Sequence, residues 1–564
     1  MIRIVSPCLL APYLFISALS AKTPVQAKHG MVVAQEPLAA DAGLTVLKSG
    51  GNAIDAAIAV GFALAVTHPV AGNIGGGGFM LIRLADGRTA FLDFRECAPK
   101  KATRDMYIGS DGNPTRESIV GWRSSGVPGT IAGFETARQK YGSKRWANLV
   151  APAIKLAREG FLVSDDFAAS LRGPSNPLQL DPESRRIFLR NGRPYDAGET
   201  LKQPELASTL ERIAANGAKE FYQGETARQL AAAMQANGGL ITEADLRDYK
   251  TIERNPLNGD YKEFHVITSP PPSAGGVGLL QMMGMLEGTD YDSAGPDSPK
   301  AVHYEAEAMR RFYADRSEYL GDPDFYNVPV RQLLDKKYLN WRRGTIDATR
   351  ATPSDIIGPG LPKSLDARVS WKESEETTHY NVVDEKGNAV AVTYTLNNSY
   401  GNGITAPGLG FLLNDEMDDF AAKPGAPNMF GMLGSDANAI EPGKRPLSSM
   451  MPTIITKNGR LFMVAGAPGG ARITTGVTEV ILDVLDFHMN AQDAVDLPRF
   501  HEQWKPDVLY LQDGFPKENQ EALRKMGYEV KPTNAVARVE AIVVDNGILA
   551  GGTESRLHGK VSGY

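Results

Sequence analysis

The pattern of hydrophobic and polar positions predicts that helices and hairpins alternate near the start of the chain. Apolar residues recur at helical spacing over 39–48 and 53–66, and Asn52 is a favourable cap for the second stretch. That second stretch is apolar nearly all round, so we expect it to form a buried helix. Two strand-like runs, 79–84 and 89–95, flank an Asp-Gly pair and predict a tight hairpin.

The rest of the chain divides into a helical part and a strand-rich part. From about residue 127 to 339 we expect an outer helical layer, with the clearest helices at 127–141, 147–158, 206–216 and 301–319. Beyond residue 378 the pattern changes to strands around Lys-Gly and Asn-Gly turns, at 380–384, 389–396, 453–456, 461–465 and 539–545. Hairpins combined with many helices predict an α+β fold, in which helices cover antiparallel sheets.

Composition and charge exclude several classes of protein. A chain of 564 residues with 42% hydrophobic and 22% charged residues can bury a large core. The net charge is -6 and no run of five or six basic residues occurs, so we expect neither a nucleic-acid partner nor binding to an anionic membrane. Two cysteines, Cys8 and Cys97, and scattered histidines indicate no internal disulfide and no metal site. A small-molecule substrate is the better expectation.

The N-terminus has the order of a secretory signal peptide. A single arginine precedes the mostly apolar stretch 4–21, and small and polar residues follow. Cleavage is expected after Ala21 or, slightly favoured, after Ala27, so the protein should be periplasmic or secreted. A membrane anchor is the alternative, but Pro7 and Pro12 interrupt a stretch shorter than the roughly 20 residues needed to span a bilayer.

Six sequence blocks carry a resemblance to a known family. The string TTHYNVVD at 377–384, directly after the polar, proline-containing run 351–376, resembles the processing site of the γ-glutamyltransferases. The other blocks are DFRE at 93–96, TYTLN at 393–397, NDEMDDF at 414–420, RPLSSM at 445–450 and GAPGG at 466–470. Together, in this order, they are highly specific and extend over nearly the whole mature chain.

The resemblance implies a fold and a way in which the chain is processed. It implies a four-layer αββα sandwich of the N-terminal-nucleophile hydrolase type, and cleavage of the chain by itself between Glu376 and Thr377. The large segment 28–376 and the small segment 377–564 would then form one intertwined heterodimer. The resemblance also implies no cofactor, a donor such as glutathione or another γ-glutamyl compound, and water, amino acids or peptides as acceptors.

Thr377 suits nucleophilic catalysis on chemical grounds alone. A threonine hydroxyl is a weak nucleophile unless a base removes its proton. A threonine at a chain terminus carries such a base in its own α-amino group, whose ordinary pKa is about 7.7 to 8.0. Freeing Thr377 would therefore supply nucleophile and base together. If Lys386 and Gly387 form the hairpin turn, Thr377 and Thr378 lie opposite Leu396 and Thr395 within about one residue.

That register makes Thr395 our candidate for orienting Thr377. Thr393, Thr395 and Asn397 share one face by the period-two rule, so Asn397 is a candidate for substrate contact. A γ-glutamyl donor presents an α-carboxylate beside an α-ammonium, and its pocket needs groups of both signs. The resemblance assigns the carboxylate to Arg95, Ser448 and Ser449, and the ammonium to Asn397, Glu416 and Asp419.

Two further loops have expected roles. Gly469 and Gly470 lie between a predicted strand and a helix from about residue 473, an arrangement that points backbone N–H groups at an anion. We therefore expect an oxyanion hole there. The run 424–444 resembles the lid loop of many bacterial family members, which often carry tyrosine at its tip. This chain has Phe430, so a hydrogen bond from the lid to Asn397 is in doubt.

Two other functions compete with this interpretation. A cephalosporin or glutaryl acylase of the same superfamily would share the nucleophile and the cleavage. Such acyl groups lack an α-ammonium, so Asn397, Glu416 and Asp419 favour a glutamyl donor. An unprocessed periplasmic binding protein would keep the pocket but not the catalysis, and its chain would stay intact.

Overall fold

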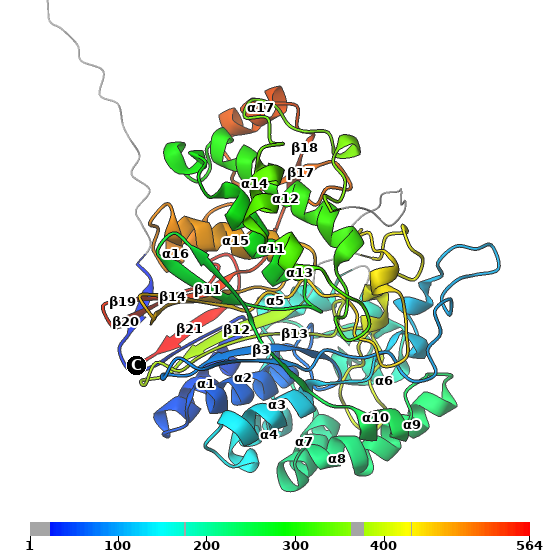
Figure 1. Cartoon of the computed structure of the whole chain (residues 1–564). Coiled ribbons are helices and arrows are strands. Elements are labelled where there is room, and N and C mark those ends of the chain that lie inside the picture. The colour runs from blue at the N-terminus through cyan, green and yellow to red at the C-terminus, as the bar shows by residue number, and fades with distance from the viewer. Residues whose placement is uncertain (1–22, 174–175, 362–376, 430) are drawn as a thin grey trace, which may run out of the picture.

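The computed structural model describes residues 23–173, 176–361, 377–429 and 431–564, and two stacked sheets form its centre (Figure 1). Each sheet has seven strands, and all pairings within both are antiparallel. In spatial order the first contains β21 (Lys560–Gly563), β2 (Met31–Ala34), β12 (Thr378–Val383), β13 (Ala389–Thr395), β3 (Gly77–Arg83), β4 (Thr89–Asp93) and β9 (Ile252–Arg254). The second contains β1 (Val25–Ala27), β20 (Ile548–Gly552), β19 (Glu540–Asp545), β15 (Arg460–Gly466), β14 (Thr453–Lys457), β11 (Phe264–Thr268) and β10 (Leu257–Tyr261).

Helices cover both outer faces of this pair of sheets, so the predicted four-layer αββα arrangement is confirmed (Figure 1). Below the first sheet lie α1 (Pro37–Lys48), α2 (Ala53–Thr67), α3 (Thr130–Tyr141), α4 (Trp146–Glu159), α7 (Pro204–Asn216), α8 (Ala218–Gln223), α9 (Glu225–Ala236) and α10 (Glu243–Asp248). On the other side lie α11 (Gly275–Leu286), α12 (Pro299–Tyr319), α13 (Val330–Leu333), α14 (Lys336–Arg343), α15 (Arg472–Leu485), α16 (Ala491–Asp496) and α17 (Lys517–Lys525).

Smaller elements complete the described chain. Two short helices, α5 (Asp165–Leu171) and α6 (Pro182–Phe188), accompany the two-stranded sheets β5–β8 (Phe161–Leu162 with Thr200–Leu201) and β6–β7 (Leu189–Arg190 with Arg193–Pro194). A three-stranded sheet contains β16 (Phe500–His501), β17 (Leu509–Gln512) and β18 (Val530–Thr533). Among the described residues, no helix combines the length and the apolar character needed to cross a membrane.

Alternation along the strands creates two cores. On β2, Val32 packs with the helices below the sheet, whereas Val33 faces the second sheet. The buried helix α2 begins as predicted: the Asn52 side chain accepts from the Asp55 backbone N–H at 2.9 Å, and the Asp55 carboxylate accepts from the Asn52 N–H at 3.0 Å. All residues of α2 are buried, as its pattern predicts.

One prediction about the middle of the chain is wrong. The stretch 127–339 is not only an outer helical layer, because β10 and β11 form a hairpin inside it and extend the second sheet. Its turn contains Lys262 in a left-handed conformation, with φ of 50°, and no glycine marks it. The predicted hairpins around the Asp-Gly, Lys-Gly and Asn-Gly turns are confirmed as β3–β4, β12–β13, β14–β15 and β19–β20.

Many strand ends meet at one end of the sandwich. There β2, β4, β13, β15 and β20 finish, and β3, β12, β19 and β21 begin. Loops from both the N-terminal and C-terminal parts of the chain therefore meet around the first residues of β12. Within the first sheet, β12 and β13 lie between β2 and β3, so C-terminal strands sit at the centre of an N-terminal frame.

Candidate active site

A small cavity at this end of the sandwich brings the predicted site residues together. All of them except Glu376 and Gly469 line it, accompanied by Met432, Met450 and Ile473. The predicted members are Arg95, Thr377, Thr395, Asn397, Glu416, Asp419, Ser448, Ser449 and Gly470. Its volume is about 20 Å³, which is space for little more than one water molecule. Glu376, on the other side of the predicted cleavage, lies outside the described residues.

Thr377 stands directly before β12 and is buried, with 5% of its surface exposed. Thr378 pairs with Tyr394, one residue from the predicted register, so Thr377 comes level with Thr395. Thr395 is fixed through its backbone and its side chain: Asn73 Nδ2 donates to its carbonyl at 2.8 Å, and its Oγ1 accepts from the Asn397 N–H at 2.9 Å. A side chain at Gly76 would collide with the Thr395 carbonyl, so only glycine allows β3 to begin this close.

Arg95 is the centre of a buried charge cluster. It follows β4 by two residues, and its guanidinium forms ion pairs with Glu416 and Asp419. The backbone around it is held by Tyr249, whose hydroxyl donates to the Arg95 carbonyl at 2.8 Å. Arg95 and Glu416 are each only 1% exposed, so this pairing takes place away from water. The groups predicted for opposite ends of the donor therefore contact each other in this structure.

Three carboxylates share the one guanidinium. Glu96 is the third, with its carboxylate buried beside Arg95 and Glu416. Burial raises its pKa to about 7, despite the opposing effect of Arg95. Burial also raises the pKa of Glu416 well above its usual range and raises the pKa of Asp419. The cluster has an excess of acidic groups, and an incoming ammonium would relieve it. Sequence reasoning did not single out Glu96, although it stands next to Arg95.

Ser448 and Ser449 are held by the segment 270–276, to which the sequence alone gives no role. The Ser448 N–H donates to the Pro272 carbonyl at 2.8 Å, and its carbonyl accepts from the Ala274 N–H at 2.8 Å. The Ser273 hydroxyl donates to the Met450 carbonyl at 2.6 Å. These bonds place the two serines at the cavity wall.

Gly469 and Gly470 form the turn that leads into α15. Their φ angles are 135° and 53°, values that residues with side chains rarely adopt. Among the described residues, none accepts a hydrogen bond from either of these backbone N–H groups. Gly470 and Ile473 line the cavity, so the N-terminal end of α15 borders the space beside Thr377. A helix start favours negative charge, as an oxyanion requires.

The predicted lid run borders the cavity through Met432 and is hydrogen-bonded to Asp419 and the nearby Asp418. The Met429 N–H donates to Asp418 Oδ2 at 2.9 Å, and Asn428 Nδ2 donates to Asp419 Oδ1 at 3.3 Å. The Met429 sulfur lies 3.8 Å from Asn397 Nδ2, and the Met432 sulfur lies 3.8 Å from Ser449 Oγ. Phe430 lies outside the described residues, so the hydrogen bond that its identity puts in doubt is not described.

Cys97 and the described residues of the predicted signal region, 23–27, are not among the residues that line this cavity. Desolvation raises the pKa of the Cys97 thiol to about 12, so the thiol stays protonated and is a poor nucleophile. Val25–Ala27, which the favoured signal cleavage after Ala27 would remove, forms β1 and pairs with β20. Cleavage after Ala21 would leave that pairing intact.

Comparison with known proteins gives consistent results. Residues 39–564 match the family model described as Gamma-glutamyltranspeptidase. The chain is 48% identical over 536 residues to the glutathione hydrolase proenzyme of Escherichia coli (strain K12), covering 94% of this chain and 91% of that protein. It is 38% identical over 524 residues to the acylase ACY 1 proenzyme of Pseudomonas sp. (strain V22), covering 92% and 90%. The fold superposes on a cephalosporin acylase from Bacillus halodurans with a TM-score of 0.84 and 29% identity, covering 99% of both chains.

Proposed function

The chain belongs to the gamma-glutamyltranspeptidase family and is an enzyme of the glutathione hydrolase type, and from this premise we propose that it cuts itself before Thr377 and then uses Thr377 as its nucleophile. The observation that carries the proposal is the position of Thr377, buried at the start of β12 in one cavity with the Arg95 cluster and Gly470. The relatives named as proenzymes support a cleaved precursor.

Self-cleavage would proceed by an ester. The Thr377 hydroxyl attacks the carbonyl carbon of Glu376, its C–O bond replaces the peptide C–N bond, and the Thr377 nitrogen takes the displaced proton. Water then hydrolyses the ester and releases a new carboxylate at Glu376. The two pieces stay together, because β12 and β13 are hydrogen-bonded to β2 and β3 on either side.

The freed Thr377 would act on γ-glutamyl amides such as glutathione. Its amino group takes the hydroxyl proton, the oxygen attacks the γ-carbonyl, and the N–H groups of Gly469 and Gly470 stabilise the resulting oxyanion. The leaving amine, Cys-Gly for glutathione, departs with a proton. Water or an amino-acid or peptide amine then takes the glutamyl group from the ester, and Thr377 regains its hydroxyl proton.

Donor recognition requires the Arg95 cluster to exchange partners. Arg95, Ser448 and Ser449 would bind the α-carboxylate, and the α-ammonium would take the place of Arg95 beside the acidic groups. The ammonium contacts would be made by Asn397, Glu416 and Asp419. A cavity of about 20 Å³ cannot hold a glutamyl group, so Met429 and Met432 must move with the lid when a donor enters.

Intact mass measurement tests the nucleophile. Purified wild-type protein should give two pieces, the smaller beginning at Thr377, whereas Thr377→Ala should stay in one piece without detectable γ-glutamyl hydrolysis. Thr456→Ala is the matched control, because Thr456 is also 5% exposed but lies on β14, outside the cavity lining, and this variant should be cut normally. An uncut wild-type chain would refute the proposal and favour a binding protein.

The acyl group is tested with two anilides. Hydrolysis of γ-glutamyl-p-nitroanilide should greatly exceed that of glutaryl-p-nitroanilide, because the latter lacks the ammonium that Glu416 and Asp419 would pair with. Equal rates would instead indicate an acylase. We also propose export to the periplasm or the medium, and N-terminal sequencing of the larger piece would show whether Ala21 or Ala27 precedes the mature chain.

A further inference from the structure

A buried arginine near the Arg95 cavity has a positive charge that no described carboxylate pairs with directly. Arg316 lies in the last turn of α12 and is only 5% exposed. Its Nε makes no hydrogen bond, and its guanidinium forms no ion pair within the described structure. Burial lowers the pKa of Arg316, and the negative charge of Asp419 opposes this effect. A buried charge is costly unless an opposite charge compensates it, so the two groups are coupled without touching.

Arg316 lies between the predicted lid run and the acidic cluster. It lines two small cavities, one bordered by Met432 and Gln503 and the other by Met432 and Asp419. Met432 and Asp419 also line the cavity that contains Thr377. Each of the two small cavities has a volume of about 10 Å³, barely enough for one water molecule, so neither holds a substrate. The charge of Arg316 must therefore act on groups of the protein itself.

Hydrogen bonds fix the backbone on both sides of this charge pair. One turn before Arg316 on α12, the Tyr313 hydroxyl donates to the Ala471 carbonyl, at the start of α15. Asp419 is held by Asn438, whose Nδ2 donates to the Asp419 carbonyl at 2.7 Å. The distance between the guanidinium and the carboxylate is therefore set by elements that the fold holds in place.

Two guanidinium groups lower the pKa of Asp419 against the effect of burial. Arg95 pairs with it directly, and Arg316 acts from farther away. The titratable groups that face this pair are, on the side of Asp419, Glu96, Asp415, Glu416 and Asp418, and on the side of Arg316, Tyr313 and Lys505. Lys505 is itself paired with Asp355. Once Arg95 turns to a donor carboxylate, Arg316 is the described side-chain cation that remains beside Asp419.

We propose that Arg316 is a positioning residue for donor binding, whose unpaired charge keeps Asp419 ionised while Arg95 exchanges partners, so that Asp419 can accept from the donor ammonium. This inference rests on the proposed function of Thr377 and on the donor contacts proposed with it. A protonated Asp419 would be neutral and would bind an ammonium more weakly, because the charge-assisted hydrogen bond is lost. Arg316 does not touch the donor and acts only through Asp419.

The pH dependence of donor kinetics tests this role. Loss of a nearby positive charge favours the protonated carboxyl group, so Arg316→Gln should move the acid limb of kcat/KM for γ-glutamyl-p-nitroanilide to higher pH by about 1 pH unit. On that limb kcat/KM falls about 10-fold, mainly through KM, because the ammonium is bound both before and after ester formation. Arg316→Lys keeps the charge and should keep the wild-type limb. Arg460→Gln is the matched control: Arg460 is exposed at the opposite end of β15 and should leave the limb unchanged.

A further variant protects the test against misfolding. Arg316→Met removes a buried charge without a direct partner, so it should unfold at a temperature no lower than wild type and show the same displaced acid limb. If Arg316→Gln does not fold, Arg316→Met alone decides.

Three outcomes would overturn the inference while Thr377 catalysis stands. They are a wild-type acid limb in the folded, self-cleaved Arg316→Met enzyme, an equal displacement in Arg316→Lys, and failure of both uncharged variants to fold, which would make Arg316 a structural residue. A wild-type enzyme that hydrolyses no donor would instead refute the proposed function itself.

Discussion

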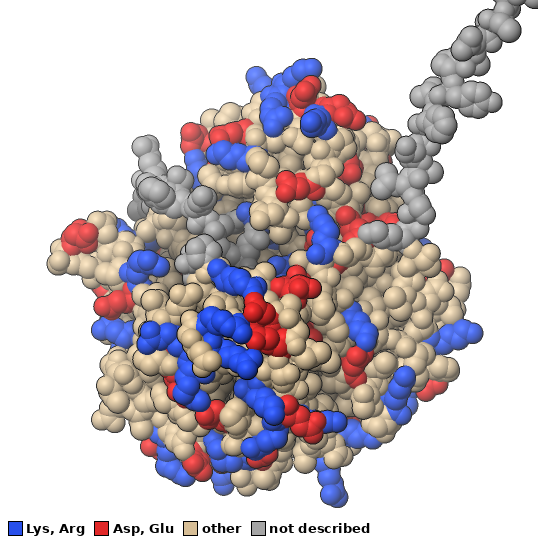
Figure 2. Space-filling model, turned by 180° about the vertical axis from the view of Figure 1, so that it is seen from behind, with Lys and Arg blue, Asp and Glu red and all other residues tan. Residues whose placement is uncertain are grey.

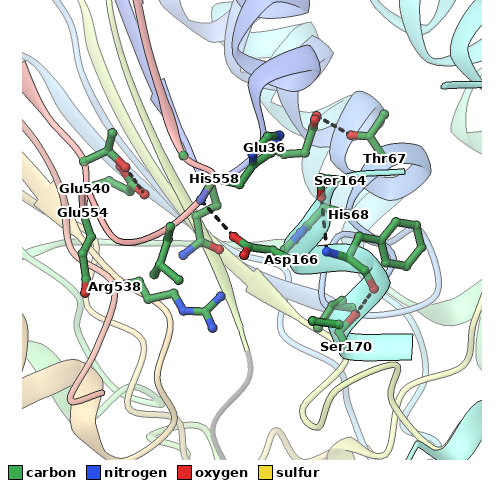
Figure 3. A pocket seen from close by; sticks show the side chains of 17 residues that line it. Glu36, Thr67, His68, Ser164, Asp166, Ser170, Arg538, Glu540, Glu554 and His558 are labelled. Atoms are coloured by element: carbon green, nitrogen blue, oxygen red, sulfur yellow. Dashed lines mark hydrogen bonds between the residues drawn. The ribbon is translucent and has the colours of Figure 1, made fainter. Parts of the chain in front are cut away.

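The Arg95 cavity and the larger cavity around Arg538 (Figure 3) differ in how their polar groups are satisfied. Around Arg95 the charges are paired with each other, and about 20 Å³ of space remains. Around Arg538 about 340 Å³ is open, and several buried polar atoms have no partner within the described structure. The smaller cavity must widen before it can hold a ligand, whereas the larger one has room for a small molecule.

This difference predicts separate effects on folding and on binding. Removing one partner of a buried ion pair leaves an uncompensated charge and costs about 3 to 5 kcal/mol of folding free energy. Removing a group that has no partner within the described structure costs the fold little. Mutations in the first cavity should therefore lower both stability and activity, whereas those in the second should change stability less.

The largest effect is expected from Arg95→Gln. This change leaves Glu416 and Asp419 without their cation and removes the group proposed for the donor carboxylate. We expect kcat/KM for γ-glutamyl-p-nitroanilide to fall by about 1000-fold, from the loss of a bidentate charged contact and of pocket order. Thermal unfolding should also occur at a lower temperature. Arg460→Gln serves as control, and an Arg95→Gln enzyme with wild-type kcat/KM would remove the contrast between the cavities.

A fall in pH should lower the folding stability that depends on His68 in the larger cavity. Burial, aided by the charge of Arg538, lowers the pKa of His68 from 6.5 to about 4. The unfolded chain therefore binds a proton more readily, so the stability due to neutral His68 is full above pH 6.5 and is lost as pH falls to about 4. The loss is about 3 kcal/mol. Between pH 7 and 4, wild type should lose this much more unfolding free energy than His68→Gln in denaturant titrations.

An exposed histidine provides the control for this measurement. His265 is 45% exposed beside Asp260, so His265→Gln should keep the acid sensitivity of wild type. The contribution of Glu416 and Asp419 to folding stability should change in the opposite direction and rise as pH falls. Their pKa values are raised in the folded chain, so it binds these protons more readily than the unfolded chain does. Identical acid profiles for wild type and His68→Gln would contradict a neutral, buried His68.

The smallest effect concerns the lid. Phe430→Tyr would add a hydroxyl within the predicted lid run 424–444, where the family resemblance implies a tyrosine that bonds to Asn397. One added hydrogen bond should change the ratio of hydrolysis to transfer by about 2- to 10-fold. The ratio is measured as p-nitroaniline release with and without glycylglycine. Phe325→Tyr, at an exposed phenylalanine, should leave it unchanged, and an unchanged ratio in Phe430→Tyr would argue against lid control.

Local signals in the sequence predicted much of the fold. Glycine turns such as Asp86-Gly87 and Asn458-Gly459 identified hairpins, because few other residues adopt their backbone angles. The β10–β11 hairpin was missed because Lys262 adopts φ of 50° without being glycine. The alternation of Phe264, Val266 and Thr268 could have revealed one of its strands.

The two cavities also differ in how far the sequence predicted their residues. Arg95, Glu416 and Ser448 lie in sequence blocks that the resemblance made visible, and the structure brings them into one cavity. Gln35, His68 and Arg538 belong to no block, since they come from separate loops that only the stacked sheets bring together. On the face shown in Figure 2, lysine and arginine side chains intermingle with acidic ones.

The central position of β12 and β13 has a further consequence for the molecularity of unfolding. Before a cut at Thr377, unfolding involves one molecule, and its midpoint temperature should not depend on protein concentration. After the cut, the same hydrogen bonds to β2 and β3 join two separate chains. Complete unfolding then releases two particles, so mass action makes the midpoint rise with concentration and makes refolding a second-order encounter. The proposed break before Thr377 would thus convert a one-chain folding equilibrium into an assembly equilibrium.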